Sequence, residues 1–338
     1  MKTLFVPTDF SQDATNALLY ALDMAKATPA KMIVFHAFFP VMSPPAAYEI
    51  PSLIPELERG KALELEEYVK EVQQAVSSDV VLDYYSTGGS YLAVDPSQQV
   101  SKSGYHTIEE IHEPVSLQAV NITCVAKMGA IFEQILSAAT AYSADLVIMG
   151  MQGHDALSQA LIGSTTLSVM RNSRIPVMGI PKGARFRGLR SVVFASDLSR
   201  QPDLFVLRKL HDFVRAYNPK LQVLHLYKHQ DQLAELKKTS LALDVLDRQL
   251  RDLAYQVVLK QKENVPEGIQ AFVQEQQADL LILSPQRHNW LDRLLNKSVT
   301  EKMTASSAFP LLTLPASEAR EATSEEAEEA EPFAAFAW

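Results

Sequence analysis

The sequence predicts two α/β domains in tandem, each a doubly wound parallel sheet covered by helices on both faces. Three observations support this fold class. The chain has 338 residues, its sequence repeats internally, and within each copy short apolar runs alternate with helical patterns. At about 150 residues per domain, the length suggests two domains. Hydrophobic residues make up 47% of the chain and charged residues 21%, which is typical of globular proteins.

The internal repeat consists of four blocks that occur twice in the same order. The matching blocks are residues 4–11 with 192–199, 33–38 with 222–227, 144–149 with 278–283, and 175–181 with 309–315. A repeat of this length, with its blocks in one order, indicates a duplicated domain.

The two copies differ in length between the second and third blocks, where the first copy has about 55 more residues. Residues 80–118 contain Gly-Gly, Asp-Pro and Glu-Pro pairs typical of turns, so we place most of this insertion there. Residues 80–85 are strand-like, which is compatible with a hairpin. The predicted boundaries are 1–181 for the first domain, 182–188 for a linker, 189–315 for the second domain and 316–338 for an acidic tail.

Each copy is predicted to alternate strands with helices. Apolar runs without polar alternation, such as residues 32–39 and 146–149, predict strands buried on both faces. Ser11 can cap the first helix, whose apolar stripe is Ala14, Leu18, Ala21, Leu22 and Ala25. Residues 233–254 are helical in period, with Leu236, Leu243, Leu246, Leu250 and Leu253 facing inward.

A glycine motif follows the strand at 146–149. Gly150 and Gly153 are followed, after nine residues, by Gly163 and then by Ser164-Thr165-Thr166 at the start of a helix. Ligands of open parallel sheets bind at the carboxyl ends of the strands, and a helix N-terminus there offers free N–H groups to anions. The glycines would let a ribose or phosphate approach the backbone closely. Asp9 ends the first strand, where it could bind a ribose hydroxyl or a metal ion, or simply cap the next helix.

This spacing resembles the universal stress protein family, whose nucleotide-binding members carry Gly-x2-Gly-x9-Gly-Ser/Thr after the fourth strand. Gly150, Gly153, Gly163 and Ser164 match it completely, and residues 6–11, 36–37, 144–147 and 175–178 are also similar to the family. The resemblance covers residues 2–181 apart from the insertion and, more loosely, 189–315. It implies a Rossmann-like fold of the adenine nucleotide alpha hydrolase type.

The resemblance also implies a site for ATP or another adenine nucleotide, with or without Mg²⁺. Carried over residue by residue, the site consists of Pro7, Thr8, Asp9, Ala37, Gly150, Gly153, Gly163, Ser164, Thr165 and Thr166. Ala37 departs from the valine that is usual in the family. We assign no catalytic residue and no metal ligand, because the histidines that recur between the copies are expected to bond to the backbone.

The second copy lacks the motif. The residues that replace Gly150, Gly153 and Gly163 are Ser284, Arg287 and Lys297. We therefore predict one competent site, in the N-terminal domain, and a degenerate partner domain. Members of the family commonly pair through their last strand, so the two copies resemble a covalently linked pseudo-dimer. Further association into a homo-oligomer stays open.

Composition excludes several other classes of protein. The net charge is −9, and the tail from residue 317 holds seven Glu and one Arg, so the body is nearly neutral and a nucleic-acid partner is disfavoured. Cys124 is the only cysteine, which excludes an internal disulfide and a thiolate zinc site. No apolar run approaches the ~20 residues of a membrane span. We therefore expect a cytoplasmic protein without a membrane partner, and a tail that is disordered or a solvated helix.

The predicted function is a stress-response regulatory protein that binds an adenine nucleotide in its N-terminal domain. One alternative is a slow nucleotide hydrolase or transferase, although no paired carboxylates, activated nucleophile or catalytic lysine converge on the glycine motif in the sequence. A second alternative is a scaffold that binds no nucleotide and acts through its surfaces and tail.

Overall fold

The computed structural model describes residues 2–39, 50–86, 120–151, 162–199, 201–228, 236–284 and 309–316. In the first domain the elements are β1 (Thr3–Pro7), α1 (Gln12–Ala27), β2 (Lys31–Phe38), α2 (Ile50–Ser86), β3 (Ile122–Met128), α3 (Ile131–Ala141), β4 (Leu146–Gly150), α4 (Ser164–Asn172) and β5 (Val177–Ile180). In the second they are β6 (Ser191–Ala195), α5 (Leu204–Tyr217), β7 (Lys220–Tyr227), α6 (Leu236–Leu250), β8 (Tyr255–Gln261), α7 (Val265–Glu275), β9 (Leu280–Leu283) and β10 (Leu311–Thr313). The predicted alternation is confirmed, except that the last helix expected in the second copy falls outside the described residues.

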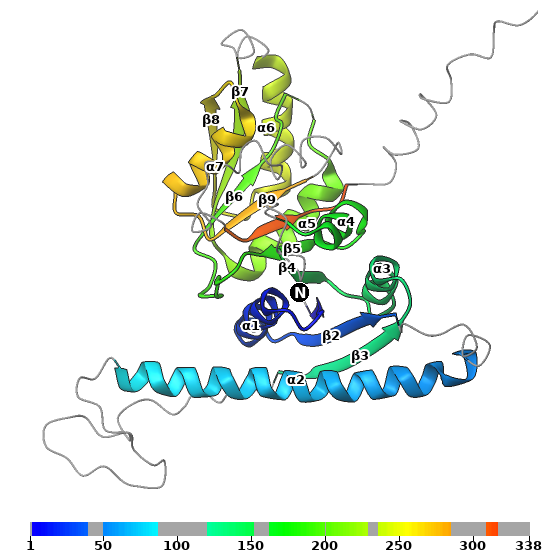
Figure 1. Ribbon diagram of the computed structural model, residues 1–338. Coiled ribbons are helices and arrows are strands. Elements are labelled where there is room, and N and C mark those ends of the chain that lie inside the picture. The colour runs from blue at the N-terminus through cyan, green and yellow to red at the C-terminus, as the bar shows by residue number, and fades with distance from the viewer. Residues whose placement is uncertain are drawn as a thin grey trace, which may run out of the picture.

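The described strands form one sheet of ten, in the order β3-β2-β1-β4-β5-β10-β9-β6-β7-β8 (Figure 1). Neighbouring strands are parallel within each domain, whereas β5 and β10 pair antiparallel, with Met178 opposite Leu312. The strands β6, β7, β8, β9 and β10 are equivalent to β1, β2, β3, β4 and β5, so the second half of the sheet repeats the order of the first half in reverse. The two domains meet through their last strands, as expected of a pseudo-dimer. In the first domain the winding reverses between β1 and β4, whose carboxyl ends lie side by side.

The first helix forms as its sequence predicts. Ser11 is the N-cap of α1, and its Oγ accepts a hydrogen bond from the backbone N–H of Ala14 at 3.2 Å. The predicted apolar stripe is buried against the sheet, with Leu18 and Ala21 fully inaccessible. β1 and β4 are buried along their whole lengths, as strands between two helical layers must be.

A repeated aspartate fixes the start of the first strand in each domain. Asp145 and Asp279 occupy equivalent positions just before β4 and β9. Each accepts hydrogen bonds from two backbone N–H groups at the start of the adjacent strand, β1 or β6. The bonds are Lys2 N–H at 2.6 Å and Thr3 N–H at 3.0 Å to Asp145 Oδ2, and Arg190 N–H at 2.7 Å and Ser191 N–H at 2.9 Å to Asp279 Oδ2. These charge-assisted bonds set the register of β1 against β4 and of β6 against β9.

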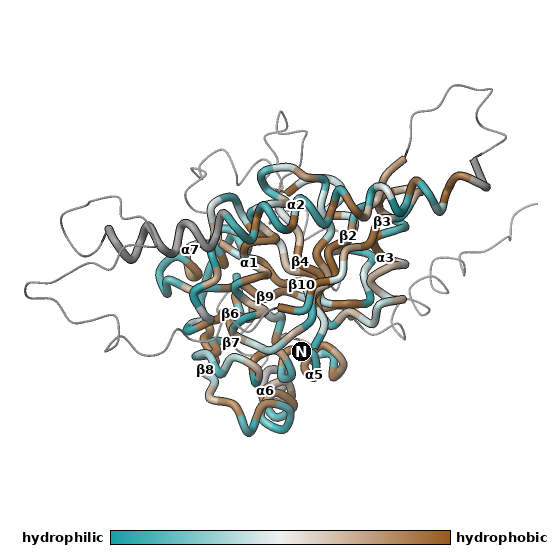
Figure 2. Tube along the Cα trace, turned by 90° about the horizontal axis from the view of Figure 1, so that it is seen from below, coloured by the Kyte–Doolittle hydropathy of each residue, from teal (hydrophilic) through white to brown (hydrophobic). Residues whose placement is uncertain are grey.

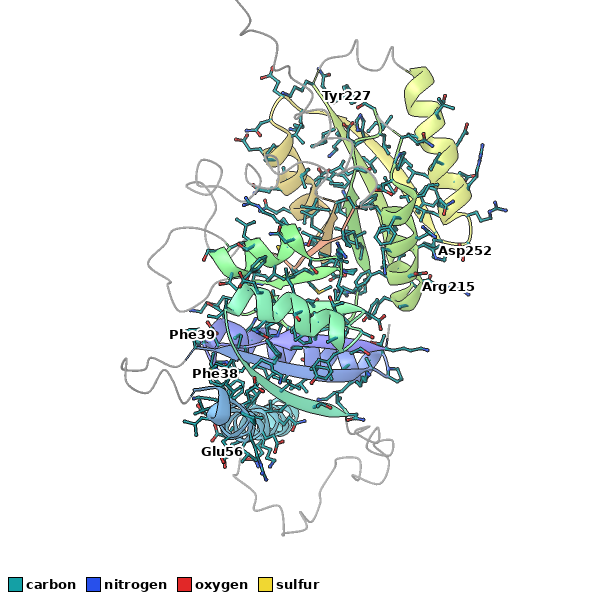
Figure 3. All side chains as sticks on the ribbon, turned by 90° about the vertical axis from the view of Figure 1, so that its right-hand side faces the viewer. Phe38, Phe39, Glu56, Arg215, Tyr227 and Asp252 are labelled. Carbon is teal, nitrogen blue, oxygen red and sulfur yellow. The ribbon has the colours of Figure 1, made fainter. Side chains whose placement is uncertain are left out.

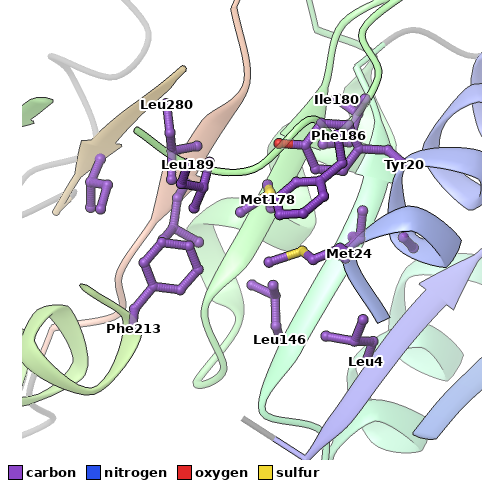
Figure 4. Packing of buried hydrophobic residues seen from close by; sticks show 14 of the residues in the cluster. Leu4, Tyr20, Met24, Leu146, Met178, Ile180, Phe186, Leu189, Phe213 and Leu280 are labelled. Carbon is purple, nitrogen blue, oxygen red and sulfur yellow. The ribbon is translucent and has the colours of Figure 1, made fainter. Parts of the chain in front are cut away.

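The hydrophobic core runs across the junction between the domains. On the face covered by α1, one cluster of buried residues includes Leu4 and Met178 from the first domain and Phe213 and Leu280 from the second (Figure 4). The cluster on the opposite face also draws on both domains. In the hydropathy view the central strands β4 and β10 are brown, and polar residues lie outside them (Figure 2).

The linker is part of this core. Phe186 is buried, and its ring packs edge-on against Tyr20 of α1 and Tyr217 of α5, with ring centroids 5.4 and 6.0 Å away. Gly183 and Gly188 flank it with φ of +78° and +90°, conformations that favour glycine. The segment predicted as a linker from its glycine and arginine content is therefore a packed strap between α1 and α5.

The strand expected at residues 80–85 is wrong, because α2 runs from Ile50 to Ser86. Leu65, Val69 and Val72 are buried at helical spacing, so the helix is anchored by packing. Helix elongation is cooperative, so it continues through a stretch whose β-branched and aromatic residues favour a strand locally. The helix has 37 residues, whereas its counterpart α6 has 15. Residues 87–119, the rest of the predicted insertion, lie outside the described residues.

None of the helices in the described part of the chain is long and apolar enough to cross a membrane.

Replacing Asp145 with alanine should lower the free energy of unfolding by about 1 kcal/mol, because two backbone N–H groups lose a charged acceptor at a partly solvated site. Urea denaturation measures this change. Asp244→Ala, on the exposed surface of α6, is the control and should leave stability unaltered. Equal midpoints for the two variants would contradict the anchoring role.

Replacing Phe186 with alanine should cost about 3 kcal/mol or more, because it removes a buried ring from the junction. The same denaturation experiment, followed by circular dichroism and by tyrosine fluorescence, reports the loss. A variant as stable as the wild type would show that the strap does not hold the domains together.

Candidate functional site

The predicted site residues come together where the winding of the first domain reverses. Pro7 is buried at the end of β1, and Gly150 ends the adjacent β4. Thr8 is 7% exposed, whereas the side chain of Asp9 is exposed. Gly163 caps α4, whose first residues are Ser164, Thr165 and Thr166. Gly153 lies outside the described residues.

Gly150 has a packing role of its own. A Cβ atom at this position would lie 2.7 Å from the backbone oxygen of Asp13, in the first turn of α1. The carbonyl oxygen of Gly150 accepts a hydrogen bond of 2.8 Å from Thr166 Oγ1, and Thr166 is buried. These two residues therefore hold the starts of α1 and α4 against the end of β4, whatever they contribute to a ligand.

The N-terminus of α4 has the features of an anion-binding site. The N-cap is Gly163, which has no side chain to accept from the first turn, and that turn contains no acidic residue. The first helical hydrogen bond runs from Leu167 N–H to Gly163 O, so the N–H groups of residues 164–166 have no acceptor within the helix. Ser164 is exposed and Thr165 half-buried. Phosphate oxygens are the ligands that such a helix start favours.

The turn after β1 is internally bonded. Thr8 N–H donates to Phe35 O at 2.8 Å, and Thr8 Oγ1 accepts from Phe10 N–H at 3.0 Å. Asp9 Oδ1 accepts from Ser11 N–H at 3.0 Å. One carboxylate oxygen of Asp9 thus shapes the turn, and the exposed carboxylate is still accessible to a ribose hydroxyl or a cation.

Ala37 lies two residues beyond the last β1–β2 pair, at the carboxyl edge of β2. It is 9% exposed and belongs to the same apolar cluster as Met149, Met151 and Ile162. Phe38 and Phe39 follow it at this edge, at the same end of the domain as Glu56 of α2 (Figure 3). The apolar surroundings of Ala37 fit the base side of a nucleotide better than its phosphates.

Asp13 is a carboxylate that the sequence did not single out. Its Oδ1 atom is buried with no hydrogen-bond partner. Burial raises the pKa of Asp13, the charge of Lys182 opposes this shift, and the charge of Asp9 adds to it. Its position in the first turn of α1, directly against Gly150, becomes visible only once the fold is known.

Two pairs of histidines recur between the copies and were weighed as metal ligands. His36 and His225 each bond to the turn after the first strand of their domain, whereas His154 and His288 lie outside the described residues. His36 Nδ1 donates to Thr8 O at 2.9 Å, and His225 Nδ1 accepts from Leu198 N–H at 3.1 Å. The described residues contain no group of three His, Cys, Asp or Glu side chains able to hold a metal ion. Cys124 is half-buried in β3, and burial raises the pKa of its thiol to about 11, so it is protonated and unreactive at neutral pH.

The corresponding edge of the second domain is built differently. Ser284 stands at the position of Gly150, and its Oγ is buried without a partner. The repeat would start α5 at residue 200, but the helix begins at Leu204 with Asp203 as its N-cap. The helical turn that excludes a Cβ at Gly150 is therefore missing, which leaves room for a serine. Arg287 and Lys297 lie outside the described residues.

The fold and this site are those of an α/β protein with two tandem domains that pair through their last strands. The sequence profile of the universal stress protein family matches residues 1–181 and 188–315. The chain therefore belongs to the universal stress protein family, with two such domains in tandem. No curated protein sequence matches the chain.

Two solved structures that match over nearly the full length of the chain agree with this fold. A universal stress protein from Archaeoglobus fulgidus DSM 4304 matches with a TM-score of 0.52 at 14% identity, covering 94% of this chain and 97% of that one. A universal stress protein from Pseudomonas aeruginosa UCBPP-PA14 matches with a TM-score of 0.51 at 11% identity, covering 97% and 98%. A universal stress protein from Archaeoglobus fulgidus in complex with dAMP covers 38% of this chain and 98% of its own, at 19% identity and a TM-score of 0.29.

Replacing Asp13 with asparagine should stabilise the protein at neutral pH. Because the folded pKa is raised, ionised Asp13 destabilises the fold above that pKa, and this cost disappears as the pH falls to the unfolded value near 3.8. The gain in melting temperature should therefore be present at about pH 7 and vanish at about pH 4. Asp244→Asn, at an exposed side chain of α6, is the control and should show no such dependence. An equal gain at both pH values would contradict the assignment.

Proposed function

We propose that this chain is a stress-response regulatory protein that binds an adenine nucleotide, ATP in the first instance, at the carboxyl edge of β1 and β4 in its N-terminal domain. The observation that carries the proposal is the α4 N-terminus. It has no capping side chain, begins at a glycine and is bonded to the end of β4, the strand beside β1, so backbone N–H groups are available to phosphate at this edge. The complete glycine motif of the family supports the same reading.

Each predicted site residue has a part in this proposal. The phosphates are bound by Gly163, Ser164, Thr165 and Thr166. The absence of side chains at Gly150 and Gly153 allows the nucleotide to approach the backbone closely. The base lies against Pro7 and Ala37. Thr8 and the exposed carboxylate of Asp9 bind the ribose or a Mg²⁺ ion that accompanies the phosphates. Bound nucleotide then stabilises one conformation of the domain, and a partner protein that binds this conformation more tightly responds to the nucleotide.

The C-terminal domain is proposed to bind no nucleotide and to act as the structural half of the pseudo-dimer. Ser284 and the late start of α5 support this, because the edge that receives the nucleotide in the first domain is assembled from other contacts in the second. A reducing, cytoplasmic location suits a chain with a single cysteine, which cannot form an internal disulfide.

The test begins with the small-molecule content of freshly purified protein, measured by mass spectrometry after denaturation. We expect about one adenine nucleotide per chain in the wild type, or a rise in melting temperature of several degrees on adding ATP and Mg²⁺. The double variant Gly153→Arg, Gly163→Lys copies the second domain and should lose both signals. Gly150 is left unchanged, because any side chain there would collide with α1.

Gly60→Lys is the matched control, since a Cβ at Gly60 on α2 meets no atom within 4 Å. It should keep nucleotide and the response to ATP. If the wild type carries no nucleotide and ATP with Mg²⁺ leaves its melting temperature unchanged, the proposal fails and the scaffold function replaces it. Release of ADP from bound ATP at a steady rate would instead indicate a hydrolase.

A further inference from the structure

The turn after β1 contains a strained residue. Phe10 has a φ of +62°, a conformation that non-glycine residues adopt at a cost of about 1 kcal/mol or more. Its equivalent in the second domain, Leu198, has no such conformation, although the flanking residues repeat. Strain of this kind persists only where the surroundings impose it, so the contacts of Phe10 identify what shapes the nucleotide side of the first domain.

An aromatic cluster holds the ring of Phe10. The ring lies 4.6 Å from the ring of His36 and packs edge-on against Tyr68, with centroids 5.1 Å apart. His36 in turn donates to Thr8 O at 2.9 Å, and Phe10 N–H donates to Thr8 Oγ1. Backbone and ring of Phe10 are thus both fixed relative to Thr8.

Tyr68 lies on α2, 53 residues after Thr15 of α1, to which it is hydrogen-bonded. Its hydroxyl lies 2.8 Å from Thr15 Oγ1. Thr15 Oγ1 donates to Ser11 O at 2.9 Å. The hydroxyl of Tyr68 therefore binds the helix residue that holds the Ser11 cap, while its ring packs on Phe10, so Tyr68 contacts the turn both at Phe10 and at the start of α1.

In the second domain the turn is closed in another way. Leu198 N–H donates to His225 Nδ1 at 3.1 Å, and Leu198 is fully buried. The histidine there takes the place of the threonine hydroxyl that receives Phe10 N–H in the first domain. The left-handed Phe10 turn thus occurs in the domain with the complete glycine motif and not in its degenerate copy.

We propose that Tyr68 is a positioning residue for the nucleotide site, which locks the Thr8–Ser11 turn through its hydroxyl and so makes nucleotide affinity depend on the position of α2. This inference rests on the proposed function. α2 leads into the residues between β2 and β3 that the second domain lacks, so a molecule that shifts α2 changes the affinity at Thr8 and Asp9. The coupling is reciprocal, and bound nucleotide stabilises α2 against β3.

The experiment compares Tyr68→Phe with the wild type in full-length protein, using ATP with Mg²⁺ as the probe. The variant keeps the ring on Phe10 and removes the hydroxyl that binds Thr15. We expect the Kd for ATP, measured by calorimetry well below the melting temperature, to rise about five- to tenfold. Amide exchange at Phe10 and Ser11, measured by NMR without nucleotide, should accelerate to a similar degree.

Tyr255→Phe is the matched control, since its hydroxyl donates to Asp247 at 3.3 Å on the second domain. It should change neither the Kd nor the exchange at Phe10. A purely structural role for Tyr68 would lower the melting temperature while leaving the Kd unaltered, and that result overturns the proposal.

The two proposals fail in different ways. If the wild type binds no adenine nucleotide, the proposed function is overturned. The amide exchange data alone then test whether Tyr68 stabilises the Thr8–Ser11 turn. Unchanged exchange at Phe10 and Ser11 in Tyr68→Phe overturns the lock as well. Tight nucleotide binding with equal Kd in both proteins preserves the proposed function and removes Tyr68 from it.

Discussion

The antiparallel pairing of β5 with β10 determines the rest of the architecture. It converts two five-stranded sheets into one, so the last strand of neither domain is left as an open edge. Both hydrophobic layers cross this pair, which makes the junction part of the core rather than a contact between two finished surfaces. The linker reinforces it, because Phe186 packs between α1 and α5. A second domain with a degenerate glycine motif keeps a physical role in this arrangement, since it covers the edge of β5 and completes the core.

Residues of the proposed site in the first domain are also needed for the packing of the fold. Gly150 allows the first turn of α1 to rest on the end of β4, and Thr166 ties the start of α4 to the same point. In the second domain the helix begins one turn later and a serine occupies the glycine position. The loss of the glycine and the shift of the helix are therefore two aspects of one change, because a Cβ and the first helical turn compete for the same space.

The sequence predicted the features that depend on local periodicity and on the repeat. The alternation of strands and helices, the cap at Ser11 and the stripe of α1 follow from patterns within about twenty residues, and the repeat supports the strands twice. Features that depend on distant contacts were missed. Residues 80–85 have strand propensity but belong to a helix anchored by Leu65 and Val69, and Phe186 is buried by residues far away in sequence. The left-handed Phe10 and its contact with Tyr68 leave no local signal, because a positive φ at phenylalanine is imposed by the fold.

α1 is the element that connects the site with the junction. Its first turn lies on Gly150, and Thr15 bonds to Tyr68. Farther along the same helix, Asp23 pairs with Arg185 of the linker at 3.2 Å, and Thr28 bonds to Tyr217 of the second domain at 3.3 Å. The edge of the proposed site and the junction with the second domain are thus connected by the contacts of a single helix.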